Sequence, residues 1–209
     1  MNIKIDTRIP FRPGGQLGAE YNHIMEDSND DWVLLCDHDI FLRCNPHWYT
    51  ICQKAIEKYG RKAGMFSCWT NHLGRTMQRD GTAPQNDHLG EHIDHATKVF
   101  KENQYHCTQV PDRFSGMFLL VKKAAWQKVG GFPGVGLFKE DWDFSKKLVK
   151  AGFKLYRIDG LYVYHLRERN RTSLVEGEPT TKELRDIRMG PKREAREKAR
   201  KAKEAKGIK

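Results

Sequence analysis

The chain has 209 residues, of which 38% are hydrophobic and 31% are charged, so it suits one domain with a buried core and a solvated terminal extension. No run approaches the roughly 18 consecutive apolar residues of a membrane span, and the N-terminus lacks the apolar region of a signal peptide. The five cysteines are scattered and form no C-x-x-C pair, which indicates reduced, mostly buried thiols. We therefore expect a cytoplasmic protein without a transmembrane segment.

The net charge of +10 is concentrated at the C-terminus. Residues 182–209 contain 12 Lys and Arg against 5 Asp and Glu, a net of +7, which leaves +3 for the rest of the chain. Pro191 precedes an alanine stripe with Glu–Lys pairs four residues apart, a pattern typical of an exposed or frayed helix. We predict a folded domain at residues 1–178 and a basic helical or disordered tail at residues 179–209.

The first half of the chain alternates predicted strands with predicted helices. Alternating isoleucines predict a strand at residues 3–9, which a turn rich in Pro and Gly follows. Residues 16–26 have helical spacing, and the continuous apolar run at residues 32–36 predicts a strand that is buried on both faces. A helix at residues 46–59 and a strand at residues 63–69 come next.

The second half begins with residues 70–111, which are polar and poorly periodic, so the sequence predicts no element there. The pattern then predicts a strand, two helices around a glycine-rich loop, and two short strands separated by Asp159-Gly160, at residues 114–121, 122–129, 140–151, 153–158 and 161–164. Alternation of strands with helices favours an α/β domain with a largely parallel sheet.

Two carboxylates, Asp37 and Asp39, follow the apolar strand directly. Negative charge concentrated at a strand end is costly without a cation, and Mg²⁺ or Mn²⁺ takes oxygen ligands that it shares with substrate phosphates. A turn in which an aspartate caps the next element explains the same residues. The motif alone leaves both interpretations open.

Three further groups of residues could do chemistry. The run KEDWD at residues 139–143 opens a predicted helix, where acidic residues favour the helix dipole but one carboxylate could also act as a general base. His165 ends the last predicted strand, where a structural role is the simpler interpretation. His88, His92 and His95 would share one helix face and could bind a transition metal, although weak helix signals favour a solvated or acceptor-binding surface.

Six segments, in order, resemble glycosyltransferase family 2 and related GT-A enzymes, in particular the short members of phage and bacterial genomes. They lie within residues 3–170, at residues 17–22, 31–39, 115–118, 126–132, 140–145 and 162–165. The resemblance implies a Rossmann-like GT-A fold, with a central, mostly parallel sheet flanked by helices. It also implies an enzyme that moves a hexosyl or pentosyl group from a nucleoside-diphosphate sugar to an acceptor hydroxyl with Mn²⁺ or Mg²⁺.

The resemblance implies roles for individual residues as well. Asp37 and Asp39 match the D-x-D motif, of which the last Asp binds the metal directly and the first lies near the ribose and the metal. His165 matches a histidine that completes the metal shell. Asp141 matches the catalytic base of inverting members, and Glu140 beside it is expected to be directed toward the acceptor.

Other matched positions are expected to contact the donor. Gly116 matches a glycine that lines the donor-sugar pocket, and Pro10 and Asn22 fall on segments that approach the nucleotide. Arg169, within the basic segment at residues 167–171, either closes over the diphosphate or belongs to an exposed polar loop. Many members have a further βα unit for the nucleotide base, and the Glu-Asp-Trp pattern also resembles retaining enzymes, so nucleotide and stereochemistry stay open.

The basic tail suggests alternatives to a simple transferase. It could bind nucleic acid through phosphate contacts, attract an anionic membrane or remain a solvated helix, and it lacks aromatic residues for base stacking. One alternative is a nucleic-acid-binding protein in which the carboxylates are structural. Another is a phage-type enzyme that transfers the sugar to modified DNA bases. The acceptor is accordingly a glycan, a small molecule or modified DNA.

Overall fold

The computed structural model describes residues 3–11, 17–73, 77–133 and 139–166. The predicted tail and Arg169 lie outside these residues. No helix within the described ranges combines the length and the apolar character that crossing a membrane requires.

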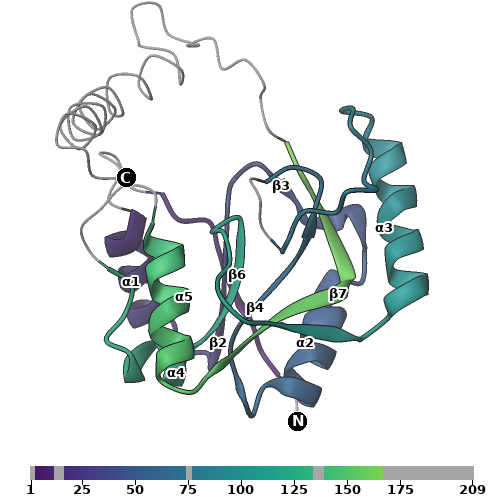
Figure 1. The fold of residues 1–209 in the computed structure, drawn as a ribbon. Helices are drawn as coiled ribbons and strands as arrows, with labels where there is room; N and C mark the ends of the chain where they lie inside the picture. Colours follow the sequence, from purple (N-terminus) through teal and green to yellow (C-terminus); the bar gives the residue numbers. More distant parts are fainter. Residues whose placement is uncertain (1–2, 12–16, 74–76, 134–138, 167–209) are drawn as a thin grey trace, which may run out of the picture. The chain divides into compact units, whose positions relative to one another are not determined.

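The described residues contain seven strands, which are β1 (Asp6–Arg8), β2 (Trp32–Cys36), β3 (Ile40–Phe41), β4 (Ala63–Thr70), β5 (Cys107–Val110), β6 (Phe118–Lys122) and β7 (Lys154–His165). They form one mixed sheet in the order β1-β2-β6-β4-β7-β3, and β5 pairs with β7 beside that path (Figure 1). The helices in the same part of the chain are α1 (Leu17–Asp27), η1 (Leu42–Cys44), α2 (Trp48–Tyr59), α3 (Leu89–Asn103), α4 (Lys123–Lys128) and α5 (Glu140–Lys150).

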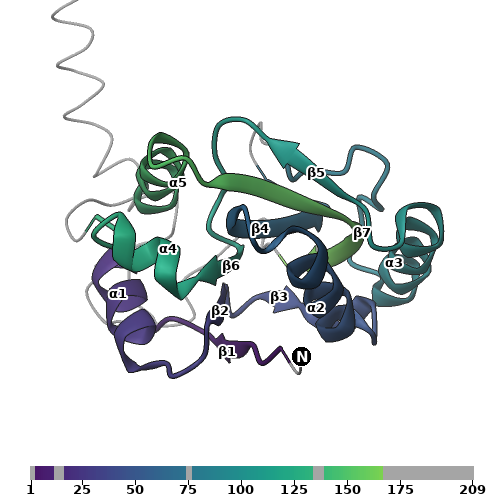
Figure 2. The same cartoon turned by 90° about the horizontal axis from the view of Figure 1, so that it is seen from below.

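Helices cover both faces of the sheet (Figure 2). All five residues of β2 are buried, because alternate side chains enter two different hydrophobic clusters. Leu34 packs in one cluster with Ile51 of α2, and Leu35 packs in the other with Met25 of α1. Helices α4 and α5 contribute to the second cluster together with α1. The apolar run therefore forms a central strand, as predicted.

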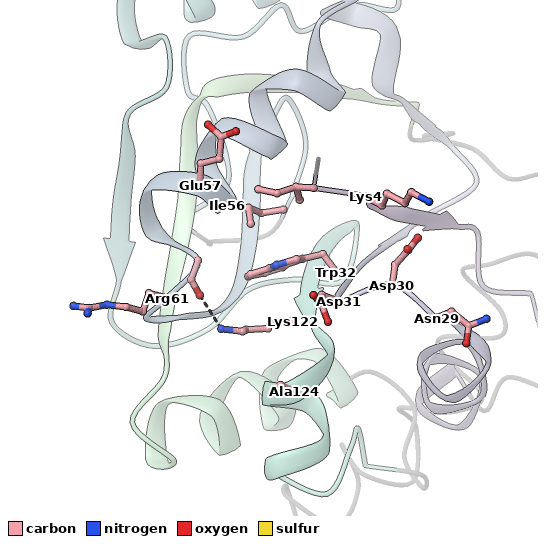
Figure 3. Close-up of a pocket in the computed structure, with 12 residues that line it drawn as sticks. Lys4, Asn29, Asp30, Asp31, Trp32, Ile56, Glu57, Arg61, Lys122 and Ala124 are labelled. Carbon is pink, nitrogen blue, oxygen red and sulfur yellow. Dashed lines mark hydrogen bonds between the residues drawn. The ribbon is translucent and has the colours of Figure 1, made fainter. Parts of the chain in front are cut away.

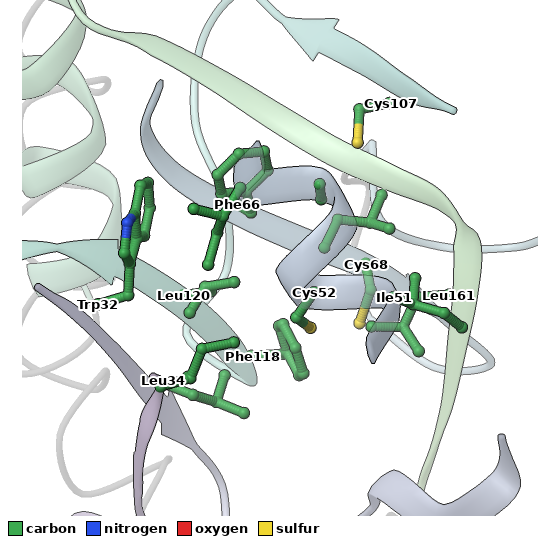
Figure 4. Close-up of a cluster of buried hydrophobic side chains, with 14 of the residues drawn as sticks. Trp32, Leu34, Ile51, Cys52, Phe66, Cys68, Cys107, Phe118, Leu120 and Leu161 are labelled. Atoms are coloured by element: carbon green, nitrogen blue, oxygen red, sulfur yellow. The ribbon is translucent and has the colours of Figure 1, made fainter. Parts of the chain in front are cut away.

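The five cysteines are buried and unbridged, as their scatter in the sequence predicts. Cys52, Cys68 and Cys107 belong to the cluster beneath α2 (Figure 4). Burial raises the pKa of the Cys36 and Cys44 thiols to about 11. Protonated thiols in such surroundings behave as small apolar side chains.

The α/β class is confirmed, but the prediction of a mostly parallel sheet is wrong. Only β1–β2 and β4–β7 pair in parallel, whereas β2–β6, β3–β7, β4–β6 and β5–β7 are antiparallel. The chain reverses direction within residues 71–106, so that β5 and β6 have the opposite direction to β4 and β7. The sequence predicts no element there, because the buried face of α3 includes His92, which a hydropathy pattern counts as polar.

The predicted turn at Asp159-Gly160 does not occur, and β7 continues through it. The register between β4 and β7 shifts there, so that residues 159–161 form a bulge. Within the bulge, the Asp159 carboxylate accepts a hydrogen bond from Nε of Arg157 at 2.8 Å. Gly160 lies so close to Gln104 that an added Cβ would be 1.8 Å from the Gln104 carbonyl oxygen.

We expect Gly160→Ala to destabilise the protein by about 1–3 kcal/mol, since the Cβ must displace backbone atoms. The measurement is the free energy of unfolding in urea. Gly90→Ala is the matched control, because open space surrounds Gly90 in α3 and alanine favours a helix by about 0.5–1 kcal/mol. Equal stability of Gly160→Ala and the parent would show that the bulge does not depend on this contact.

Candidate functional site

Asp37, Asp39 and His165 lie together at one edge of the sheet. The backbone N–H of Asp37 donates to the Met117 carbonyl at 3.0 Å, which holds the end of β2 beside the segment before β6. Strand β3 begins directly after Asp39 and pairs Ile40 with His165. One ligand atom from each of the three side chains lies within 4.8 Å of the other two. In the described part of the chain, no other group of His, Cys, Asp or Glu side chains meets this criterion.

Two residues that follow β4 fix the position of His165. Asn71 holds its backbone from both sides, since Oδ1 accepts from the His165 N–H at 2.9 Å and Nδ2 donates to the His165 carbonyl at 3.3 Å. The carbonyl of His72 lies 3.2 Å from Nδ1, which must therefore carry the proton and donate. In the neutral ring, the lone pair is then on Nε2, 3.3 Å from Oδ1 of Asp39. Metal-binding histidines are commonly oriented in this way.

The electrostatics of these three side chains favour a cation. Burial raises the pKa of Asp37. The charge of His165 lowers this pKa, and the charge of Asp39 raises it further. Burial raises the pKa of Asp39 too, but the hydrogen bond and charge of His165 hold it below the ordinary value. Burial lowers the pKa of His165, but Asp39 and Asp37 raise it more. When both carboxylates are ionised, their two negative charges exceed the single positive charge of a protonated His165 ring, and the charge of His38 lowers the pKa of both.

Asp141 occupies the first turn of α5 beside Gly116 of the segment before β6. Burial raises the pKa of Asp141 to about 6, against hydrogen bonds from the backbone N–H groups of Trp142 and Gly116. A Cβ added to Gly116 would lie 3.5 Å from Oδ2 of Asp141 and 3.1 Å from the Tyr21 hydroxyl. Glycine therefore allows the backbone to approach Asp141 and Tyr21 closely. Burial raises the pKa of Tyr21 most, and the negative charges of Asp37 and Asp141 are the next largest causes. Both carboxylates therefore lie near the Tyr21 hydroxyl.

Glu140 is buried against the beginning of α1, with 6% of its surface exposed. Its Oε2 accepts from the Lys139 N–H at 2.9 Å, whereas Oε1 has no hydrogen-bond partner among the described residues. A Cβ on Gly18 would lie 3.0 Å from its Cγ. The charge of Glu140 helps to raise the pKa of Asp141. Contact of Glu140 with an acceptor stays a prediction.

Asn22 binds its own chain. Its Oδ1 accepts from Nε1 of Trp126 at 2.9 Å and from the Phe132 N–H at 2.8 Å, and its Nδ2 donates to the Phe132 carbonyl at 2.9 Å. These bonds attach α1 to the turn at Gly131, whose φ of +74° suits glycine. Asn22 thus has a structural role that the sequence did not reveal. Nucleotide contacts of Asn22 and of the half-buried Pro10 beyond β1 stay predictions.

The three histidines near α3 have separate partners. His92 is buried, with Nδ1 2.7 Å from the Tyr162 hydroxyl, and His95 has Nε2 2.8 Å from Oδ2 of Asp80. His88 is exposed and precedes the helix. They therefore do not meet at a common metal site, and His92 belongs to the buried face of α3 instead of a solvated surface.

A pocket of about 900 Å³ lies at the opposite end of β2 (Figure 3). Trp32 begins β2 and lines the pocket, whereas Asp37 follows the last residue of that strand. Nζ of Lys122 donates to the Gly60 carbonyl at 3.0 Å along one wall. Since ligands of open α/β sheets bind at the carboxyl ends of parallel strands, we assign the candidate site to the Asp37 edge.

No protein-family model matches the chain, and no curated protein matches it. Solved structures do match, among them the crystal structure of S. aureus TarS 1-349. That match has a TM-score of 0.45 and 17% identity, and it covers 72% of this chain and 40% of that chain. The chain thus spans less than half the length of that structure. At this similarity the match supports no function, so any function must follow from the residues of the site.

If His165 is a metal ligand, we expect Asn71→Ala to weaken Mn²⁺ binding about 10- to 100-fold, since the residue that positions His165 is lost. The free ion can be measured by electron paramagnetic resonance during a Mn²⁺ titration. Asn29→Ala, at an exposed position, is the control and should bind like the parent. Equal Mn²⁺ affinity of both variants would remove the positioning role of Asn71.

Proposed function

We propose that this chain is a metal-dependent glycosyltransferase that moves a hexosyl or pentosyl group from a nucleoside-diphosphate sugar to an acceptor hydroxyl. The observation that supports the proposal most is the convergence of Asp37, Asp39 and His165 within 4.8 Å. A turn explains an aspartate at a strand end, but it does not explain an imidazole, 12% exposed, that faces a carboxylate from another part of the chain.

The donor set fits Mn²⁺ or Mg²⁺. Asp37, Asp39 and His165 would hold the ion, with two carboxylate oxygens and one imidazole nitrogen whose tautomer is already set. When bound, the ion would neutralise the charge that develops on the leaving diphosphate. The excess negative charge of the cluster is thereby compensated.

Asp141 is the proposed general base. Its carboxylate would take the proton of the acceptor hydroxyl while the hydroxyl oxygen bonds to the anomeric carbon. The bond from that carbon to the phosphate oxygen breaks, and the nucleoside diphosphate leaves with inversion. The backbone N–H of Gly116 donates a hydrogen bond to the Asp141 carboxylate and so helps to hold the base in place. The buried charge of Glu140 helps to keep the pKa of the base near its working range.

The proposal does not include nucleic acid. The hypotheses of a nucleic-acid binder and of a DNA-modifying enzyme depend on the tail at residues 179–209, outside the described residues. The acceptor in this proposal is a glycan or a small hydroxyl compound.

Calorimetric titration of a panel of nucleoside diphosphates, with and without Mn²⁺, tests the donor site. We expect at least one nucleotide to bind only when Mn²⁺ is present, and Asp39→Ala to weaken that binding by at least about tenfold. Asp143→Ala, at an exposed carboxylate of α5, should bind as the parent does. If no nucleotide binds, or if binding ignores both Mn²⁺ and Asp39→Ala, the proposed function is wrong.

The pH dependence of kcat/KM tests the base. A base acts only when ionised, so a pKa raised to about 6 predicts that kcat/KM falls as the pH drops below about 6. Asp141→Asn should lower kcat by about 10²- to 10⁴-fold, whereas Asp143→Asn should not.

Stability provides the folding control for Asp141→Asn. The pKa of Asp141 is raised above the ordinary 3.8, so its ionisation disfavours the folded state as the pH rises through this range. The variant should therefore be at least as stable as the parent at pH 8. Full activity of Asp141→Asn, or an acid limb near pH 4, would exclude Asp141 as the base.

A further inference from the structure

A second polar pocket, of about 470 Å³, lies where α3, β5 and β7 meet. Of the candidate site residues that the sequence singles out, His95 alone lines it. Helix α3 packs against β7, and β5 is the antiparallel neighbour of β7 in the sheet (Figure 2). The volume lies within the range of roughly 300–1,000 Å³ that is typical of small-molecule sites.

The floor of the pocket is a buried hydrogen-bond network around Asp159. Its carboxylate, on a residue 4% exposed, accepts from Nε of Arg157 at 2.8 Å, Nδ1 of His106 at 2.7 Å and Oγ1 of Thr108 at 2.6 Å. The Arg157 guanidinium stacks on the Trp69 ring at 3.5 Å. These contacts hold each polar group in one orientation, as binding sites require.

A second carboxylate orients a second histidine of the same pocket. Oδ2 of Asp80 lies 2.8 Å from Nε2 of His95, and Oδ1 accepts from the Thr82 N–H at 2.8 Å. A neutral imidazole that donates to a carboxylate through one nitrogen has a lone pair on the other. His95 and His106 therefore offer acceptors, and Arg157 and Lys98 supply donors.

The network is closed on its inner side and open on its outer side. The side chain of Asp159 is 6% exposed, whereas that of its partner His106 is 63% exposed. His106 therefore presents the outer edge of its imidazole to solvent and to the pocket, where a ligand can contact it.

The charges of the lining define the class of ligand. Lys98 and Arg157 oppose Asp80, Glu102 and Asp159, which leaves one negative charge when the histidines are neutral. Such a lining selects against diphosphates and other polyanions. Hydroxyl groups both donate and accept hydrogen bonds, so they match a lining of fixed donors and acceptors.

The segment that follows β4 connects this pocket with the candidate metal ligands. The carbonyl of Thr70 accepts from the Asp80 N–H at 2.9 Å, and the next residue, Asn71, holds His165. We propose that the pocket binds a neutral saccharide unit of the acceptor. The inference rests on the proposed function, because a sugar transferase with a glycan acceptor binds a second carbohydrate near its donor site.

Saturation-transfer NMR of the full chain tests the pocket without nucleotide or metal. The probes are maltose, cellobiose, lactose and chitobiose. Inorganic phosphate is the charged probe, and its binding is followed by broadening of its ³¹P signal. We expect at least one disaccharide to bind, and His106→Ala to weaken it about tenfold. His23→Ala, at an exposed histidine of α1, is the matched control and should leave binding unchanged.

Three outcomes would overturn the assignment. They are the absence of disaccharide binding at millimolar concentration, disaccharide binding that His106→Ala leaves intact, and binding of phosphate alone. Asp39→Ala separates this inference from the proposed function, since it should abolish Mn²⁺-dependent nucleotide binding and preserve disaccharide binding. Disaccharide binding without nucleotide binding would retain the pocket as a saccharide site and remove its role as an acceptor subsite.

Discussion

The candidate site depends on the pairing of β3 with the end of β7. The two-residue strand places Ile40 opposite His165, and the Leu166 N–H donates to the Asp39 carbonyl at 2.8 Å. These contacts bring a carboxylate that follows one strand to an imidazole at the end of another. Asn71 adds the third restraint, since its amide binds both backbone groups of His165. A ligand shell held by backbone pairing loses little entropy when an ion binds.

The same edge of the sheet holds more negative charge than packing requires. Burial raises the pKa of Asp37 and of Asp141, and Oε1 of Glu140 is buried without a hydrogen-bond partner among the described residues. Each feature costs folding free energy, because a buried carboxylate loses hydration that nothing nearby fully replaces. Carboxyl groups whose pKa values are shifted by burial and by one another cluster at functional sites.

The segment between β4 and β5 has three roles. It reverses the chain, so that β6 enters the sheet antiparallel between β2 and β4. It provides Asn71 and His72, which position His165. It also provides Asp80, which lines the second pocket. Helix α3 packs an apolar face with Ala96 and Val99, but other side chains of the segment bind polar groups of β7. These polar contacts connect the two sites.

Local pattern was sufficient to predict elements such as β2, which is buried on both faces and followed directly by Asp37. The sequence also indicated the carboxylate pair, the reduced cysteines and, through the resemblance, the partnership with His165. The strand directions, the bulge at Gly160 and the positioning role of Asn71 became evident from the folded chain. These features arise from contacts between residues far apart in the chain, whereas periodicity reports only which face of its own helix or strand a side chain occupies.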